Sequence, residues 1–115
     1  MASVGGSVSD DNRRATRHHV SIPSKLIVDG ADYPATILNI SLGGAQVVLT
    51  DLTNPKHSMG QRLSISFMVP IVNHSVEIGA TVRWADSTGG VGLQFDGLRA
   101  RDVWALNEYF KKRKL

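Results

Sequence analysis

Three stretches of this chain alternate apolar residues with other residues at a strict period of two. Side chains point to opposite faces at successive steps along a β-strand, so this alternation predicts strands with one buried and one solvent-exposed face. Such strands are typical of an antiparallel sheet. The alternating apolar residues are Leu63, Ile65, Phe67 and Val69 in the first stretch, Val76, Ile78, Ala80, Val82 and Trp84 in the second, and Val91, Leu93 and Phe95 in the third.

Turn signals divide the preceding part of the chain into further short strands. Asp29 and Gly30 lie between two apolar runs, a pattern that favours a two-residue β-hairpin. The stretches PATILNI and AQVVL flank Gly43 and Gly44, which predicts a corner between two more strands. About six short strands of this kind indicate a closed barrel or a sandwich.

The last segment, LRARDVWALNEYFKKRK, changes to a helical period. Val103, Leu106 and Phe110 recur at the spacing of one helix face, with Leu98 or Asp102 near the start. The last turn is rich in Lys and Arg, which suits the negative end of the helix dipole. We therefore expect an all-β domain with one amphipathic C-terminal α-helix packed on it.

The length and composition indicate one globular domain. The chain has 115 residues, of which 42% are hydrophobic and 20% charged. We expect residues 1–11, which are rich in Gly, Ser and Asp, to be a flexible tail, and residues 12–115 to form the domain. No stretch approaches the roughly 20 apolar residues of a membrane span and no secretory signal is recognisable, so we expect a cytoplasmic protein without membrane contact.

The sequence offers little for catalysis or metal binding. It contains no cysteine, and it has no nucleophile elbow, no phosphate-binding Gly-rich loop and no pair of carboxylates on a common face. His18 and His19 are adjacent, so on an extended segment they point in opposite directions. His57 and His74 fall in predicted loops without a carboxylate at ligand spacing. We interpret all four histidines as surface or turn residues, and we expect a protein that is not an enzyme and binds no metal.

Three arginines crowd into five positions just before the chain turns apolar. Arg13, Arg14 and Arg17 stand in the stretch NRRATRHHVSIP, in a chain with a net charge of +3. One interpretation is a solvated charge run on a flexible arm. The other is phosphate or guanine recognition, because a guanidinium group can form paired hydrogen bonds with phosphate oxygens or with the O6 and N7 atoms of guanine.

The stretch NISLGG also has two interpretations. In the first it is a turn, in which Asn39 and Ser41 cap backbone groups and the glycines adopt positive φ. In the second it is a polar ledge that binds a base edge or a phosphate, where a side chain at Gly44 would obstruct the ligand. The turn is the favoured interpretation when the stretch is taken alone.

Taken together, these two stretches resemble the PilZ domain, a family of bacterial receptors for the second messenger cyclic di-GMP. The family pattern is Arg-x-x-x-Arg, followed about 20 to 30 residues later by Asp/Asn-x-Ser-x-x-Gly. The stretch ATVRWADSTGGVGLQF also resembles the closing strand pair of the family, so the resemblance covers about residues 12–110. The residues that fit are Arg13 and Arg17 in the first motif, with Arg14 inside it, and Asn39, Ser41 and Gly44 in the second.

The resemblance implies a six-stranded antiparallel β-barrel, flanked by the helix, with the arginine arm across its mouth. The arginines would hold phosphates and guanine edges, Asn39 and Ser41 would bind a base, and Gly44 would leave room for the ligand. Trp84 is a further candidate, since some members shield a base with an aromatic residue at the matching strand, although its alternation favours a core or rim position. The implied ligand-binding residues are Arg13, Arg14, Arg17, Asn39, Ser41, Gly44 and Trp84.

The function that this resemblance implies is that of a stand-alone cyclic di-GMP receptor, which changes conformation on binding and regulates a protein partner in trans. Cyclic di-GMP is then a regulatory ligand, and no cofactor is expected. Residues 1–19 have few apolar groups to bury, so we expect this arm to be mobile until ligand phosphates neutralise its charge.

Two alternatives stay open. One is a PilZ-like adaptor that binds protein but no nucleotide. The other is a small basic barrel that binds single-stranded nucleic acid, for which aromatic residues interleaved on one sheet face are expected. Phe67 and Trp84 are the only aromatic residues positioned for stacking on bases, so DNA is not an expected partner.

Overall fold

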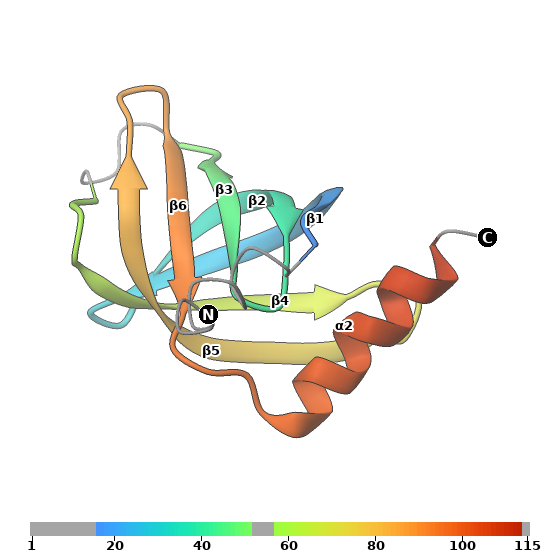
Figure 1. Ribbon diagram of the computed structural model, residues 1–115. Helices are drawn as coiled ribbons and strands as arrows, with labels where there is room; N and C mark the ends of the chain where they lie inside the picture. The colour runs from blue at the N-terminus through green and yellow to red at the C-terminus, as the bar shows by residue number, and fades with distance from the viewer. Residues whose placement is uncertain (1–15, 52–56, 114–115) are drawn as a thin grey trace, which may run out of the picture.

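The computed structural model describes residues 16–51 and 57–113. Six antiparallel strands close into a barrel in the order β1-β2-β3-β6-β5-β4, and one helix follows them (Figure 1). The predicted six-stranded antiparallel barrel with a C-terminal helix is confirmed. The elements are β1 (His18–Val28), β2 (Ala31–Ile40), β3 (Gly44–Leu49), β4 (Arg62–Val69), β5 (His74–Ala85), β6 (Gly90–Phe95) and α2 (Ala100–Lys112).

A tight hairpin at Asp29 and Gly30 connects β1 to β2. Both residues have positive φ, 51° and 83° respectively, and Val28 pairs with Ala31 across the turn. Two consecutive positive φ values are typical of a type I′ turn, whose twist matches that of the flanking strands. The hairpin predicted from the Asp-Gly pair is confirmed.

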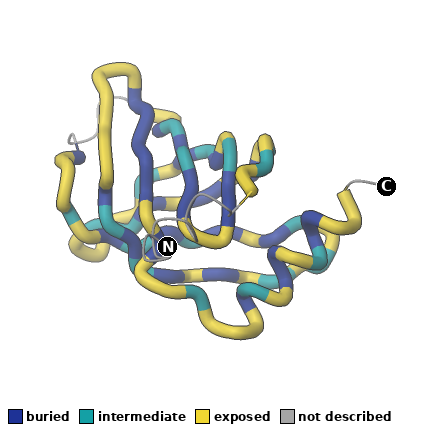
Figure 2. The backbone as a smooth tube through the Cα atoms, viewed as in Figure 1, coloured by how far each residue is buried: buried dark blue, intermediate teal, exposed yellow. Residues whose placement is uncertain are grey.

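The alternating apolar residues fill the interior of the barrel (Figure 2). Burial of apolar surface contributes about 25 cal/mol per Å², which makes this interior the main source of stability. Trp84 is the one member of the three alternating runs that is not buried. The buried members are Leu63, Ile65, Phe67, Val69, Val76, Ile78, Ala80, Val82, Val91, Leu93 and Phe95, and strands β1 to β3 add Ile22, Leu26, Ile37, Ile40 and Val47 among others.

Three irregularities interrupt the strand pairing, and the first lies in β1, where the pairing with β2 shifts between His19 and Ile22. In β2 the extra residue is Leu38, so the pairing with β3 shifts just before Asn39. In β5 the extra residue is Arg83, and the pairing with β6 shifts between Val82 and Trp84. An extra residue moves the following side chain to the other face of the sheet. The interpretation of Trp84 as a core residue is therefore wrong, because the bulge places its indole on the outer surface, where it is 41% exposed.

Helix α2 packs its apolar face against β4 and β5 (Figure 1). The amphipathic helix predicted for the end of the chain is confirmed, although Val103 is only half-buried. The residues that face the barrel cover the interior from this side. They are Asp102, Ala105, Leu106, Tyr109 and Phe110.

The C-terminal end of α2 contacts the start of β1. The ring of Phe110 stacks on the ring of His18 with 3.7 Å between the centroids, and Arg113 donates a hydrogen bond of 2.6 Å to the carbonyl oxygen of His19. Both histidines belong to β1 and pair with β2. The boundary of the mobile arm expected at residue 19 is therefore wrong, because the strand begins at His18.

Asp102, in the first turn of α2, is a fully buried carboxylate. Nε2 of His74 lies 2.8 Å from one of its oxygens, and Nε of Arg99 donates to the other at 3.2 Å. Burial acts to raise the pKa of Asp102, but the hydrogen bonds from His74 and Arg99 and the charge of Arg99 outweigh burial and hold this pKa below its ordinary value. The contact between His74 and Asp102 joins α2 to the barrel.

The two histidines expected in surface loops occupy other environments. His74 lies at the start of β5, and its ring is bonded to Asp102. His57 is buried, with its ring edge against Tyr33 at 6.1 Å between centroids. The predicted loop is confirmed for His57, although the residue is buried there, and it is wrong for His74, because contacts between segments that are distant in the sequence decide both environments.

We expect the free energy of unfolding to fall as the pH is lowered below about 4. The reason is that the pKa of Asp102 is lower in the folded than in the unfolded protein, so this carboxylate stabilises the fold only while it is ionised. Asp102→Asn should weaken this dependence and lower the free energy of unfolding at pH 7 by about 1–3 kcal/mol, because a charged acceptor of two hydrogen bonds is lost. Urea unfolding followed by circular dichroism at pH 7 and pH 3 measures both effects. Asp32→Asn, at a half-exposed carboxylate paired with Lys25, is the control. An unchanged pH dependence in Asp102→Asn would contradict this role.

Candidate functional site

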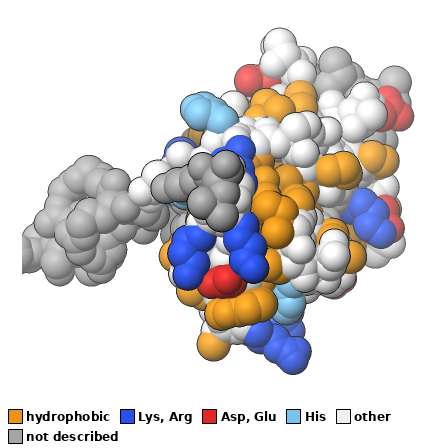
Figure 3. Space-filling model, turned by 90° about the vertical axis from the view of Figure 1, so that its right-hand side faces the viewer, with side chains coloured by type: hydrophobic (Ala, Val, Ile, Leu, Met, Phe, Trp, Pro, Cys, Tyr) orange, Lys and Arg blue, Asp and Glu red, His pale blue; other side chains and the backbone are white. Residues whose placement is uncertain are grey.

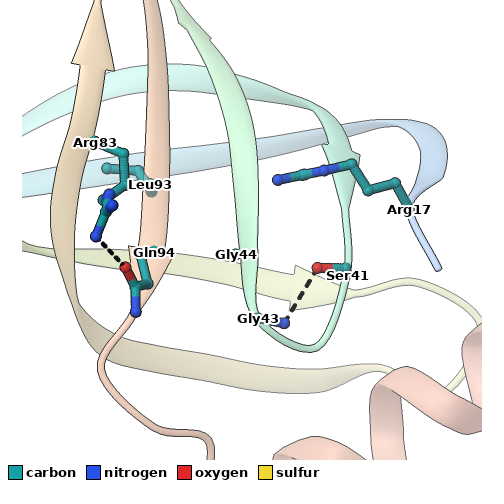
Figure 4. A pocket seen from close by; sticks show the side chains of 7 residues that line it. All are labelled: Arg17, Ser41, Gly43, Gly44, Arg83, Leu93 and Gln94. Atoms are coloured by element: carbon teal, nitrogen blue, oxygen red, sulfur yellow. Dashed lines mark hydrogen bonds between the residues drawn. The ribbon is translucent and has the colours of Figure 1, made fainter. Parts of the chain in front are cut away.

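A pocket of about 240 Å³ opens on the barrel surface, where the turn between β2 and β3 meets β5 and β6 (Figure 4). Three of the predicted ligand residues, Arg17, Ser41 and Gly44, lie together in it, although they are distant in the sequence. Their role in binding stays a prediction. The described residues that line it are Arg17, Ser41, Gly43, Gly44, Arg83, Leu93 and Gln94.

A short chain of side-chain hydrogen bonds holds Arg17 over the sheet. Nη1 of Arg17 donates to Oδ1 of Asn39 at 2.7 Å, and Nδ2 of Asn39 donates to Oε1 of Gln46, also at 2.7 Å. The bond to Gln46 fixes the orientation of the Asn39 amide so that its oxygen faces Arg17. In this structure Asn39 positions the arginine, a role that the sequence did not suggest. Gln46, which supports Asn39, was also missed.

Ser41 stabilises the turn between β2 and β3. Its Oγ accepts a hydrogen bond of 3.1 Å from the N–H of Gly43, and its own N–H donates to the carbonyl of Gly44 at 2.9 Å. The interpretation of NISLGG as a turn is confirmed for Ser41. The side chain of Asn39 bonds to other side chains instead of capping this turn.

Gly44 is required by the packing of two strands. Neither Gly43 nor Gly44 has positive φ, so the conformation expected for these glycines is wrong. Strands β3 and β6 approach so closely that a Cβ atom at Gly44 would overlap the carbonyl oxygen of Leu93. A side chain at Gly44 would therefore meet the backbone of β6 before it met a ligand.

Gly44→Ala is expected to lower the free energy of unfolding by about 1–3 kcal/mol, because the added Cβ atom must push β3 away from β6. Urea unfolding measures this change. Gly43→Ala, at the exposed neighbouring position, is the matched control and should change stability by less than about 0.5 kcal/mol. Equal stability of the Gly44→Ala variant and the wild type would show that the strands can separate without cost.

Two residues of the pocket, Arg83 and Gln94, escaped the sequence analysis. Arg83 is exposed, and its Nη1 donates to Oε1 of Gln94 at 2.7 Å. Gln94 pairs with Gly44 in the register of β3 and β6, so it stands beside the pocket. The alternation along β5 predicts an outward position for Arg83, but spacing alone does not show that the turn between β2 and β3 lies near it. The available signal was that Arg83 is the single cationic residue of the stretch ATVRWADSTGGVGLQF.

Trp84 stands at the end of a row of cross-strand neighbours on the outer surface. The row consists of Asn39 in β2, Gln46 in β3, Gly92 in β6 and Trp84 in β5. The indole lies against Gly92, since a Cβ atom there would overlap the indole ring. Trp84 does not line the pocket, so the structure does not bring it together with Arg17.

Gly92→Ala is expected to displace the indole of Trp84 from the sheet. The chain has two tryptophans, so Trp104→Phe leaves an emission that reports on Trp84. In that background Gly92→Ala should shift the emission to longer wavelength and increase quenching by iodide, because the indole becomes more exposed to water. Ser66→Ala, in β4, serves as the control. The same emission with and without the Gly92 substitution would contradict the placement of the indole.

The remaining predicted residues are divided between the described and the undescribed parts of the chain. Arg13 and Arg14 lie outside the described residues, as does the tail expected at residues 1–11, so these expectations stay predictions. Phe67 is buried in the interior, whereas Trp84 lies on the outer surface. The two aromatic residues thus occupy opposite faces of the sheet and do not form the stacking surface expected of a single-stranded nucleic-acid binder.

Residues 16–51 and 57–113 offer neither a metal-binding cluster nor a membrane-spanning helix. No group of three or more His, Asp or Glu side chains in these ranges could hold a metal ion. Helix α2, the one helix in these ranges, is too short and too polar to cross a membrane.

The fold agrees with what comparisons with known proteins show. Residues 11–112 match the PilZ domain, and the chain therefore belongs to the PilZ domain family. Among solved structures, the inhibitor of motility MotI/DgrA of Bacillus subtilis is similar, with 26% sequence identity and a TM-score of 0.71. The similarity covers 89% of this chain and 50% of the MotI/DgrA chain, so this chain spans half the length of that one. No curated protein matches the sequence.

Proposed function

We propose that this PilZ protein is a receptor for cyclic di-GMP that regulates a protein partner and catalyses no reaction. The observation that carries the proposal is the pocket, which brings Arg17 of the first motif together with Ser41 and Gly44 of the second. These are the positions by which the sequence resembles the receptors of the family.

The chemistry of the pocket suits an anionic nucleotide. Among the described residues that line it there is no acidic side chain, so the charge of Arg17 is available to a phosphate. A guanidinium group binds phosphate oxygens, or the O6 and N7 edge of guanine, through paired hydrogen bonds. Asn39, which accepts a hydrogen bond from Arg17 in this structure, has an amide that could exchange this bond for one to a guanine base.

The contacts between β1 and α2 support a route from the ligand to a partner. Arg17 directly precedes β1, whose first residues contact the helix through Phe110 and Arg113. A ligand that repositions Arg17 acts on these contacts, and the surface beside α2 changes with them. Figure 3 shows Lys and Arg side chains gathered on this side of the molecule, where the last turn of α2 carries Lys111 and Lys112.

Titration calorimetry tests the proposal. We expect cyclic di-GMP to bind with a dissociation constant of about 1 μM or tighter, and GTP and a short single-stranded oligonucleotide to bind far more weakly. Arg17→Ala should weaken binding of cyclic di-GMP by about 1.5–3 kcal/mol, because a charged hydrogen-bond donor is lost, while the melting temperature stays close to that of the wild type. Arg101→Ala removes an exposed arginine from α2 and is the matched control.

Other results of these measurements contradict the receptor function or the role of Arg17. Equal heats for GTP and cyclic di-GMP, or no heat with either, contradict the proposed receptor function. If neither nucleotide gives heat, heat with the oligonucleotide favours a nucleic-acid-binding barrel. No heat with any of the three probes favours an adaptor that binds protein alone. A fall of many degrees in the melting temperature of Arg17→Ala would make the arginine a structural residue.

A further inference from the structure

Arg83 lies on the wall of the pocket opposite Arg17. Figure 4 shows Arg17 reaching in from the side of β2 and Arg83 on the side of β5, with Gly43 and Gly44 between them. Neither of the two sequence motifs includes Arg83, and the receptor function proposed above uses the Arg17 wall. The side of the pocket formed by β5 thus carries its own positive charge, that of Arg83.

Regular alternation along β5 places Arg83 on the outer face, and the bulge places Trp84 on that face beside it. Arg83 falls between Val82, which is buried in the core, and Trp84, which lies on the outer surface. A regular strand would turn the residue after Arg83 back into the core, whereas the bulge leaves two consecutive side chains outside. Bulges recur next to binding sites, where they re-aim a side chain.

Gln94 orients the guanidinium group of Arg83 beside the pocket. The hydrogen bond between them, from Nη1 to Oε1, is 2.7 Å long, and Gln94 is the cross-strand partner of Gly44. Because Gln94 is uncharged, this contact orients Arg83 without neutralising it. The other N–H groups of the guanidinium are left for a further acceptor.

The charges of both arginines stay unbalanced within the part of the chain that the structure describes. No ion pair among residues 16–51 and 57–113 includes Arg17 or Arg83. Asp96 pairs with Arg62 at 2.6 Å, and Asp86 accepts hydrogen bonds within its own turn. Two like charges that face one pocket repel each other until an anion lies between them. The pocket therefore favours an anionic ligand that reaches both walls.

We propose that Arg83, oriented by Gln94, is a second phosphate-binding arginine, which binds one phosphate group of the ligand while Arg17 binds another. This inference deepens the proposed function and rests on it for the identity of the ligand. A planar guanidinium matches a phosphate with two parallel hydrogen bonds. Arginines on two walls recognise a ligand that carries phosphate groups on two sides, as a cyclic dinucleotide does.

Titration calorimetry with cyclic di-GMP on the wild type, Arg83→Ala, Arg83→Lys and Arg101→Ala tests this role. Arg83→Ala should raise the dissociation constant tenfold or more, and Arg83→Lys, which keeps the charge but loses the planar group, should give an intermediate value. Arg101→Ala should bind like the wild type. Arg83→Ala should also reduce the dependence of the dissociation constant on salt concentration, a change that a purely structural role would not produce.

Two results separate the failure of this inference from the failure of the proposed function. If the wild type and Arg83→Ala bind cyclic di-GMP equally well, the role of Arg83 is overturned and the receptor function stands. If the wild type does not bind cyclic di-GMP, the receptor function fails, and inorganic pyrophosphate becomes the probe. Shifts in the NMR signals of the Arg83 Nε–H and the Gly44 amide on addition of pyrophosphate then support an anion site between the two walls, and unchanged signals overturn it.

Discussion

The closed ring of six strands has one interior, and every strand must present its apolar side chains to it. Strands β3 and β6 contain no extra residue, whereas the pairing of β1 shifts between His19 and Ile22, and β2 and β5 each contain one extra residue, Leu38 and Arg83. The bulge in β2 keeps Ile40 inside the core and turns Asn39 to the outer surface, and the bulge in β5 turns Trp84 to the outer surface. The outer surface that carries the candidate site is therefore a consequence of how the core is filled.

On that outer surface, two neutral amides orient two cations. Asn39 accepts a hydrogen bond from Arg17, and Gln94 accepts one from Arg83, each at 2.7 Å. An amide oxygen holds a guanidinium group in place but leaves its charge uncompensated. An anion that binds here meets side chains that are already ordered, so less conformational entropy is lost on binding. This arrangement favours recognition of phosphates without a carboxylate that competes with them.

Helix α2 is attached to the barrel by different interactions at its two ends. In its first turn, the buried carboxylate of Asp102 is bonded to His74, and this bond helps to hold the pKa of the carboxyl below its ordinary value. In its last turn, Phe110 stacks on His18, next to the arm that carries Arg17. The first attachment holds the helix on the barrel, and the second lies where a ligand on the arm can alter it.

The sequence by itself determined the features that depend on neighbours along the chain. Alternation at period two, an Asp-Gly turn and a helical period near the end led to the strands, the hairpin and the helix, and two motifs led to the PilZ domain family. The tertiary structure alone decided which side chains share a face or a partner. A bulge exists only relative to the strand beside it, so the outward position of Trp84 could not be inferred from spacing. The place of Arg83 in the pocket depends on the neighbouring strands and could not be inferred either. In the same way, Gly44 is needed because of the carbonyl of Leu93, a contact between strands that only the closed barrel brings together.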